Sequence, residues 1–277
     1  MLVAINYGIG LETGWIESIQ PALLKSLAYF TLYATVYYFS CWISVYAVGA
    51  QHLLQSARFW KISALLLAAL TLQRGIPGIF FLIQNTMPIS WHPWQSALIS
   101  NITSNLGVLT AAIVLMTIKY IHQQDKLGLA TFKNRNVFLL LILLFIPIIA
   151  VVARLTDFAS YYPLYPEPGP IGIAQMASAL SFESSYAFDL FCIELLFRGC
   201  LVIGMYSLLG RHAVLPMVTL YLVIHFGKPM GEAISSIVGG YALGIIALRT
   251  KSIWGGIALH IGIAMMMEVG AYWSRYA

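Results

Sequence analysis

Stretches of apolar residues, separated by short polar or proline-containing segments, follow one another along most of the chain. Each is close to the roughly 20 residues that an α-helix needs to cross a hydrocarbon core about 30 Å thick. The pattern therefore predicts an all-α fold with about eight transmembrane helices. Their expected bounds are residues 27–49, 63–83, 98–118, 137–153, 184–209, 213–226, 231–248 and 252–270.

Three of the predicted helices depart from a uniform apolar run. The second contains glutamine, arginine, glycine and proline within residues 73–77, which predicts a kink. The third opens with polar residues at 101–105, which are tolerated only against other protein or near the interface. The sixth has only 14 residues, so it either extends into Gly227 and Lys228 or crosses a thin or wet region.

A proline-rich segment at residues 161–170 divides the chain. Proline lacks a backbone N–H and clashes with the preceding helical turn, so we expect a loop or an interfacial crossing here. Loops of three to five residues join the last four helices, which makes sequential helices antiparallel neighbours. We therefore expect an N-terminal part with about four spans, residues 1–183, and a C-terminal four-helix bundle, residues 184–277.

The seventh predicted helix carries small residues at four-residue spacing, namely Ser236, Gly240 and Gly244. Small residues in this arrangement let two helix backbones approach closely. The stripe therefore predicts a tight contact between helices.

Composition also favours a membrane protein. Hydrophobic residues make up 60% of the 277 residues and charged residues 9%, and the mean hydropathy is +0.83. This balance excludes an ordinary soluble domain, so we expect a multi-pass integral protein of the cell (inner) membrane, in contact with the lipid bilayer. No basic run with interleaved aromatic residues occurs, which argues against a nucleic-acid partner.

Lysine and arginine residues are shared unequally between the predicted loops. If the N-terminus is outside, nine of them lie on the inner side and four on the outer side. Basic loops favour the cytoplasm. We therefore expect both termini outside and the 119–136 loop inside.

Ionisable residues inside the last four predicted helices indicate a functional site. A charge near the bilayer centre costs roughly 3 kcal/mol, so such residues normally face a bundle interior or a wet cavity. Glu194 and Arg198 are four residues apart and share a helix face, where they can form an ion pair. A structural salt bridge explains that pair equally well. Four more ionisable residues follow in the next three helices: His225, Glu232, His260 and Glu268.

Histidines and carboxylates in one bundle suit proton chemistry. A histidine beside a carboxylate can act as a general base on water, and a second histidine can stabilise an oxyanion. His260 and Glu268 lie eight residues apart, which keeps them on one helix face. A lone histidine is more often structural, but we expect these residues to converge.

Three motifs in order resemble those of a known family. They are Glu194-x-x-x-Arg198-Gly199, Tyr221-x-x-x-His225 and His260 in the last helix. Over about residues 184–270 they are similar to the CPBP (Abi) family of intramembrane proteases, which includes the type II CAAX prenyl endopeptidases and bacteriocin-processing or self-immunity proteins.

The resemblance implies an intramembrane endopeptidase that acts on a membrane-associated protein or peptide. Within such a site, Glu194 would be the first choice for the carboxylate that activates water, and Arg198 would hold this carboxylate ionised and in place. His225 would be the partner base, and His260 would orient water or stabilise the oxyanion. In the predicted orientation these groups share the outer half of the bilayer, so we expect a pocket open to the extracytoplasmic side.

Two positions depart from the family pattern. The first of two adjacent glutamates is Ile193 here, and the usual asparagine four residues after the last histidine is Ala264. Glu232 and Glu268 are additional acids, which we expect to be accessory carboxylates of a rearranged site. A non-catalytic immunity or scaffold protein with the same fold is the alternative.

Cofactor use stays open at this stage. Two histidines and three carboxylates could ligate zinc or another divalent metal, but the His-Glu-x-x-His motif is absent. A glutamate and histidine site without a metal is equally consistent. A transporter is disfavoured, because no inverted repeat is visible between the two halves.

Overall fold

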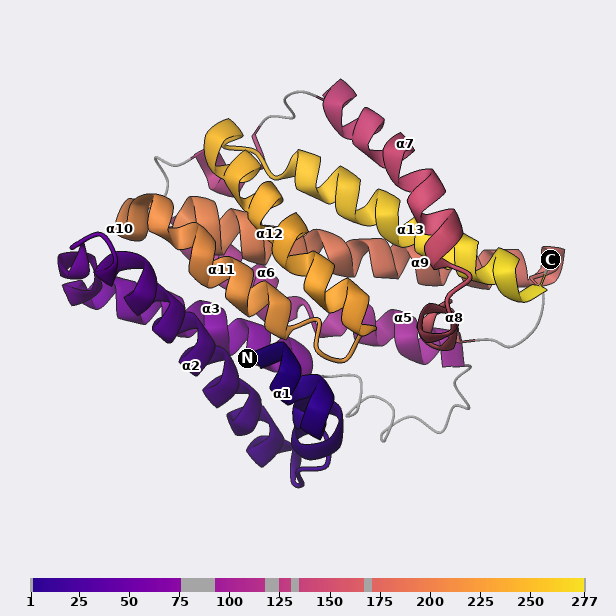
Figure 1. Ribbon diagram of the computed structural model, residues 1–277, viewed down its shortest axis with the longest axis horizontal. Coiled ribbons are helices and arrows are strands. Elements are labelled where there is room, and N and C mark those ends of the chain that lie inside the picture. The colour runs from indigo at the N-terminus through magenta and orange to yellow at the C-terminus, as the bar shows by residue number, and fades with distance from the viewer. Residues whose placement is uncertain (1, 76–92, 118–124, 131–134, 167–170, 277) are drawn as a thin grey trace. The chain divides into compact units, whose positions relative to one another are not determined.

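The computed structural model describes residues 2–75, 93–117, 125–130, 135–166 and 171–276 (Figure 1). Every regular element within these ranges is a helix, which confirms the predicted all-α fold. Helix α3 (Ala57–Gly75) is the last element of the first of these ranges. The predicted kink at residues 73–77 stays a prediction, because Pro77 lies outside the described residues.

Four helical segments of the described chain are long and apolar enough to cross a membrane. The first is formed by α5 (Pro93–Thr103) and α6 (Leu106–Thr117) together, and the second is α7 (Arg135–Val152). The others are α12 (Met230–Thr250) and α13 (Trp254–Tyr276). The chain is thus an integral membrane protein, while the count of eight spans stays a prediction.

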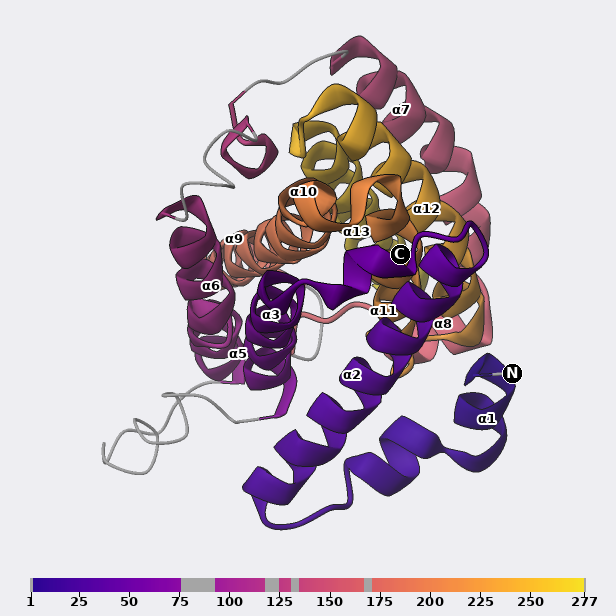
Figure 2. The same cartoon turned by 90° about the vertical axis from the view of Figure 1, so that its left-hand side faces the viewer.

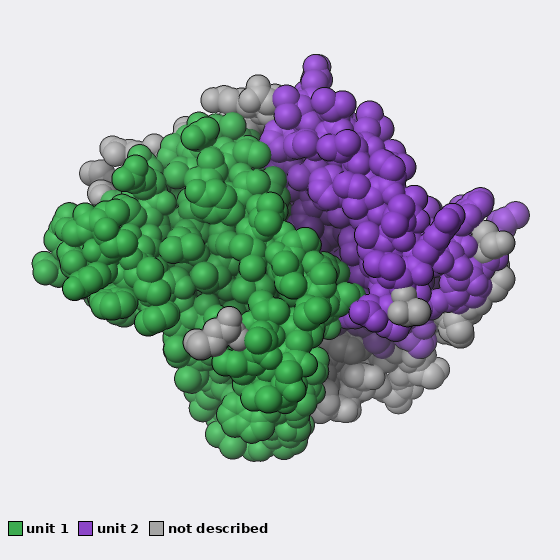
Figure 3. Space-filling view, viewed as in Figure 1, with its two compact units in different colours: residues 1–76, 106–133, 194–254 green, residues 77–105, 134–193, 255–277 purple. Residues whose placement is uncertain are grey.

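The chain forms two compact units that alternate along the sequence (Figure 3). Unit 1 comprises residues 1–76, 106–133 and 194–254, and unit 2 comprises residues 77–105, 134–193 and 255–277. The predicted boundary between residues 183 and 184 divides the chain differently and stays a prediction. The predicted C-terminal four-helix bundle also stays a prediction, because α13 belongs almost entirely to unit 2.

Unit 1 begins with α1 (Leu2–Ile9), the π-helix η1 (Leu11–Ile16) and α2 (Ala22–Tyr46). Its later elements include four short helices and two longer ones. They are η2 (Gln51–Gln55), η3 (Asp125–Gly128), the π-helix η4 (Leu195–Gly204), α10 (Tyr206–Leu209), η5 (Gly210–Ala213) and α11 (Val214–Val223), besides α3, α6 and α12.

The short helix α11 lies beside α2 and α12 in both views (Figures 1 and 2). The small residues of α12 make the second contact possible. A Cβ atom at Gly240 would lie 3.0 Å from the Tyr221 ring, and one at Gly244 would lie 2.6 Å from Met217. The predicted tight helix contact is therefore confirmed. One alternative for the sixth span is wrong, since α11 ends at Val223 and does not extend into Gly227.

The π-helix η4 packs against η3. A Cβ atom at Gly199 would lie 3.1 Å from the Leu127 carbonyl oxygen, and one at Gly204 would lie 3.3 Å from the Leu127 side chain. Leu127 is fully buried and has a positive φ of 58°. The glycine that follows Arg198 therefore provides room for a loop located about 70 residues earlier in the chain.

Unit 2 contains α5, α7, α8 (Thr156–Tyr161), α9 (Ile173–Glu194, whose last residue is in unit 1) and α13. The Phe138 ring of α7 fills the space that a side chain at Gly255 of α13 would occupy. The proline-rich segment leaves the helical conformation after Tyr161, as predicted for its described residues.

The polar residues that open the third span bind α9. Asn101 Nδ2 donates to Ser185 Oγ at 3.1 Å, and Asn105 Nδ2 donates to Asp189 Oδ1 at 2.6 Å. These bonds satisfy polar groups that would be costly in an apolar surrounding. Of the two predicted surroundings, contact with other protein is thus the one found for Asn101 and Asn105.

Candidate active site

Glu194 and Arg198 form a completely buried ion pair. Arg198 Nη1 donates to Glu194 Oε1 at 2.8 Å, and both residues have 0% solvent exposure. Glu194 ends α9, and Arg198 lies in the π-helix η4 that continues it. Backbone hydrogen bonds of this wider type recur at functional sites. The predicted ion pair is confirmed, whereas the π-helix has no recognisable sequence signal.

The aromatic ring of Tyr221 forms the second layer of the site. The guanidinium carbon of Arg198 lies 4.2 Å from the centre of this ring, and the Phe197 ring meets it edge-on at 5.1 Å. A cation over a tyrosine face is stabilised by the ring quadrupole, especially away from water. Tyr221 of α11 thus supports Arg198, which in turn holds Glu194.

His225 lies in the turn that follows α11 and is 6% exposed. Its Nδ1 atom is 2.7 Å from the Tyr221 carbonyl oxygen. A carbonyl only accepts hydrogen bonds, so Nδ1 carries the proton and Nε2 carries the lone pair of the neutral ring. The structure therefore orients His225 with its basic nitrogen at Nε2.

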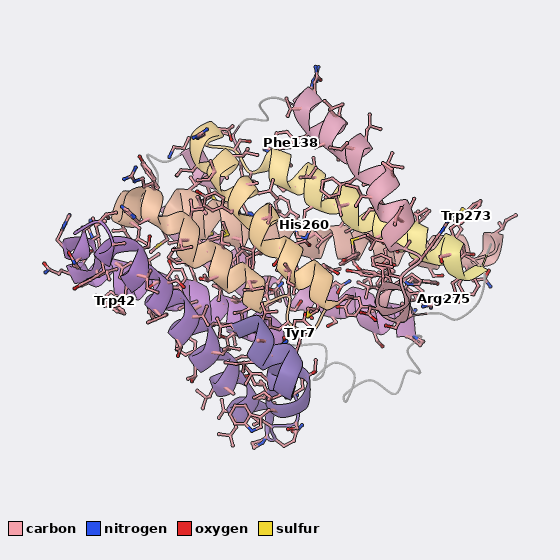
Figure 4. The ribbon with its side chains drawn as sticks, viewed as in Figure 1. Tyr7, Trp42, Phe138, His260, Trp273 and Arg275 are labelled. Atoms are coloured by element: carbon pink, nitrogen blue, oxygen red, sulfur yellow. The ribbon has the colours of Figure 1, made fainter. Side chains whose placement is uncertain are left out.

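The N-terminal helix α1 supports the turn that contains His225. Asn6 Nδ2 donates to the Phe226 carbonyl at 3.1 Å, and the Tyr7 hydroxyl donates to the Lys228 carbonyl at 2.6 Å. Figure 4 labels Tyr7 on this helix. Neither residue was recognised from the sequence, because more than 200 residues separate each from its partner.

Glu232 follows the same loop and lies in the first turn of α12. Lys228 Nζ donates to Glu232 Oε1 at 2.6 Å, and both side chains are about one-fifth exposed. The structure therefore brings Glu232 into the loop region of His225, where it neutralises a lysine.

His260 and Glu268 both lie on α13 in unit 2, where Figure 4 labels His260. His260 is partly buried and Glu268 is buried. Both carboxylate oxygens of Glu268 accept the backbone N–H of Leu164, at 3.0 and 2.8 Å. Each unit is described by itself, so the convergence of His260 with Glu194 stays a prediction.

Metal ligation has no assembled donor set in the described part of the chain. No three histidine, cysteine, aspartate or glutamate side chains lie together there in a way that would hold an ion. In unit 1, Glu194 binds Arg198 and Glu232 binds Lys228.

Comparison with known proteins finds one family that matches part of the chain. Residues 176–266 match the family described as type II CAAX prenyl endopeptidase Rce1-like. No curated protein and no solved structure matches the chain. The matched segment contains Glu194, Arg198, Tyr221, His225 and His260, which carried the resemblance to the CPBP proteases. Residues 176–266 are therefore similar to the Rce1-like type II CAAX prenyl endopeptidase family, in agreement with the resemblance that these motifs carried.

Proposed function

We propose that this protein is a membrane-embedded endopeptidase that hydrolyses a peptide bond in a membrane-associated protein or peptide. The observation that carries the proposal is the buried arrangement of Glu194, Arg198, Tyr221 and His225 inside the family-matched segment. Burying a carboxylate, a guanidinium and an imidazole together is costly, which favours a role in chemistry.

Glu194 is the proposed activator of water. Its carboxylate takes a proton from water, and the resulting hydroxide adds to the carbonyl carbon of the scissile peptide. When the carbon–nitrogen bond breaks, the leaving amine takes up a proton. Arg198 keeps Glu194 ionised, because an adjacent positive charge stabilises the carboxylate form.

His225 is the proposed partner base. With Nδ1 bound to the Tyr221 carbonyl, Nε2 can accept a proton from water or return it to the leaving amine. His260 is proposed to orient water or to stabilise the oxyanion.

Glu232 and Glu268 are proposed as accessory carboxylates, because Ile193 and Ala264 replace polar residues of the family pattern. Their present partners, Lys228 and the Leu164 N–H, are then part of how each acid is held. Replacing each acid by glutamine keeps its size and removes its charge. We expect at least one replacement to lower activity about 100-fold, as the loss of a general acid or base does.

The proposal is tested with purified protein in lipid nanodiscs and a quenched fluorescent peptide that carries a farnesylated C-terminal CAAX sequence. The same peptide without the farnesyl group measures the need for the lipid. Wild-type protein should cleave a peptide bond, and Glu194→Gln, His225→Asn and His260→Asn should each abolish cleavage while the protein still accumulates in the membrane. Full activity in all three variants would refute the assignment.

Two further arms address the alternatives. Cleavage that survives prolonged treatment with a strong chelator would refute a metal-dependent mechanism. A panel of membrane-anchored peptides presented on either face of proteoliposomes would test the proposed extracytoplasmic substrate. Absence of cleavage across the panel, with a correctly folded protein, would favour the non-catalytic immunity or scaffold protein.

A further inference from the structure

One end of unit 1 is basic. Three stretches of this unit, residues 47–62, 205–215 and 246–253, contain no aspartate or glutamate. The neighbouring η3 adds one charge of each sign, Asp125 and Lys126, and it joins the third stretch because the Ile253 N–H donates to the Gly128 carbonyl at 3.1 Å. The basic end, as we call it, consists of five cationic residues and two histidines: Arg58, Lys61, Arg211, Arg249 and Lys251, with His52 and His212.

Tertiary contacts bring the three stretches of the basic end together. The short helix η2 packs against α2, α3 and α10, and Figure 2 looks onto this end of unit 1. Ser44 Oγ of α2 lies 3.4 Å from His212 Nδ1 of η5. Lys251 Nζ, just after α12, lies 3.9 Å from the centre of the Tyr206 ring of α10. The cationic residues therefore form one surface, although up to about 200 residues separate them in the sequence.

The chain itself leaves the charge of the basic end uncompensated. The lysines at the opposite ends of α2 and α12, Lys25 and Lys228, each form an ion pair with a glutamate. By contrast, no ion pair among the described residues involves Lys61, Arg211 or Arg249, and all three are exposed. Exposed cations that share one surface create a positive potential, which attracts anions. The counter-charge must therefore come from outside the chain.

The basic end lies at the depth of lipid head groups. Helix α12 is long and apolar enough to cross a membrane, and Arg249 and Lys251 lie on either side of its last residue. Exposed aromatic side chains stand beside the cationic ones: Trp42 (Figure 4) and Tyr46 lie in the last turns of α2, and Trp60 lies in the first turn of α3. Tryptophan and tyrosine concentrate at the membrane–water interface. Cations and aromatic residues thus meet the same layer of the bilayer.

We propose that the basic end binds the phosphate groups of anionic phospholipids. All five cationic residues are among those predicted on the inner side, where the lipid surface is negative. A zwitterionic head group adds a positive charge next to its phosphate and gains less from this surface. An acidic protein segment would supply charge but would leave the exposed aromatic residues without the interface that they favour. None of these residues belongs to the Glu194 cluster, so the proposal does not rest on the proposed function.

Native mass spectrometry of the purified protein tests this surface. The protein in neutral detergent is titrated with dioleoyl phosphatidylglycerol, which is anionic, and with dioleoyl phosphatidylcholine, which has the same chains and no net charge. We expect phosphatidylglycerol to bind at least about 30-fold more tightly, because each lysine or arginine near an anionic lipid surface strengthens binding about fivefold. A higher concentration of ammonium acetate should reduce this preference, since salt screens exposed charges.

Variants that remove charge show where the lipid binds. Lys61→Gln, Arg211→Gln and Arg249→Gln should each weaken phosphatidylglycerol binding about three- to fivefold, and the triple variant should keep a preference of about threefold or less. Arg211→Lys retains the charge and should bind within about twofold of wild type. The control Arg154→Gln removes an exposed arginine of unit 2 and should bind like wild type.

Two results would overturn the proposal directly: equal affinity of the wild type for both lipids, or a wild-type preference in the triple variant. These substitutions are at exposed positions and should leave folding intact, which thermal unfolding checks. A polyglutamate peptide tests for an acidic protein partner, and we expect no displacement of phosphatidylglycerol. Displacement that requires the three cationic residues would assign the surface to an acidic segment instead. Peptide cleavage is not measured here, so failure of this proposal leaves the proposed endopeptidase untouched.

Discussion

The hydroxyl of Tyr7 donates a 2.6 Å hydrogen bond to the backbone carbonyl of Lys228, which lies 221 residues later in the chain. The neighbouring Asn6 side chain binds the carbonyl of Phe226, and its own Oδ1 accepts the N–H of Glu12. The first helix is thereby tied to the turn that carries His225. A segment outside the family match thus determines the conformation of a proposed catalytic loop.

Removing the Tyr7 hydroxyl should loosen this turn. We expect Tyr7→Phe to lower the free energy of unfolding by about 1 kcal/mol, the net value of one hydrogen bond. The rate constant kcat should fall about tenfold, because misplacing a catalytic group by a fraction of an ångström is costly, while KM changes little. Tyr46→Phe, at an exposed position of α2, is the control. Equal kcat values for both variants would contradict this role.

The buried ion pair should behave differently when one or both partners are removed. We expect Arg198→Met alone to destabilise the protein by roughly 3–5 kcal/mol, because it leaves Glu194 charged and buried. Adding Glu194→Gln should restore most of the stability and none of the activity. Thermal unfolding in detergent and the peptide assay measure the two effects.

A partly exposed ion pair provides the comparison for that experiment. Lys25 and Glu17 are 3.1 Å apart, and the Glu17 side chain is 46% exposed. Lys25→Met should therefore change stability by less than about 1 kcal/mol. If the Arg198→Met single variant were no less stable than Lys25→Met, the inferred cost of the uncompensated carboxylate would be wrong.

Two adjacent glycines of α12 separate packing from helix propensity. A Cβ atom at Gly240 would lie 3.0 Å from the Tyr221 ring, whereas one at Gly239 would meet nothing within 4 Å. We expect Gly240→Ala to displace Tyr221 and lower activity severalfold. Gly239→Ala should leave activity unchanged and stabilise the helix by about 0.5–1 kcal/mol. The opposite ranking in the peptide assay would argue against a supporting role of Tyr221.

The predicted orientation places the ends of the last two helices on opposite sides of the membrane. Single cysteines at Arg249 and Ser274 occupy exposed positions near these ends. In intact cells, a membrane-impermeant thiol reagent should label position 274 and spare position 249, as both termini outside requires. The reverse labelling would turn the proposed pocket toward the cytosol.

The sequence by itself determined the features that depend on local spacing. Hydropathy over runs of about 20 residues predicted a helical membrane protein. The four-residue spacing of Glu194 and Arg198 placed both on one helix face, where the structure has them bonded at 2.8 Å. The same spacing in Gly240 and Gly244 predicted a close helix contact, which the structure forms with α11. Each inference needs only helix geometry and the cost of polar groups in an apolar environment.

Tertiary structure alone decided which distant segments meet. Tyr7 and the His225 turn, Leu127 and Gly199, and Glu183 and Glu268 are brought together by chain folding. The spacing of residues in the sequence shows which of them share a face of one helix. It does not show which face of another helix packs against them. Which helix faces meet depends on the packing of all side chains at once. The grouping of cationic residues at the basic end of unit 1, and a cavity between α9 and α13, could therefore be found only in the three-dimensional structure.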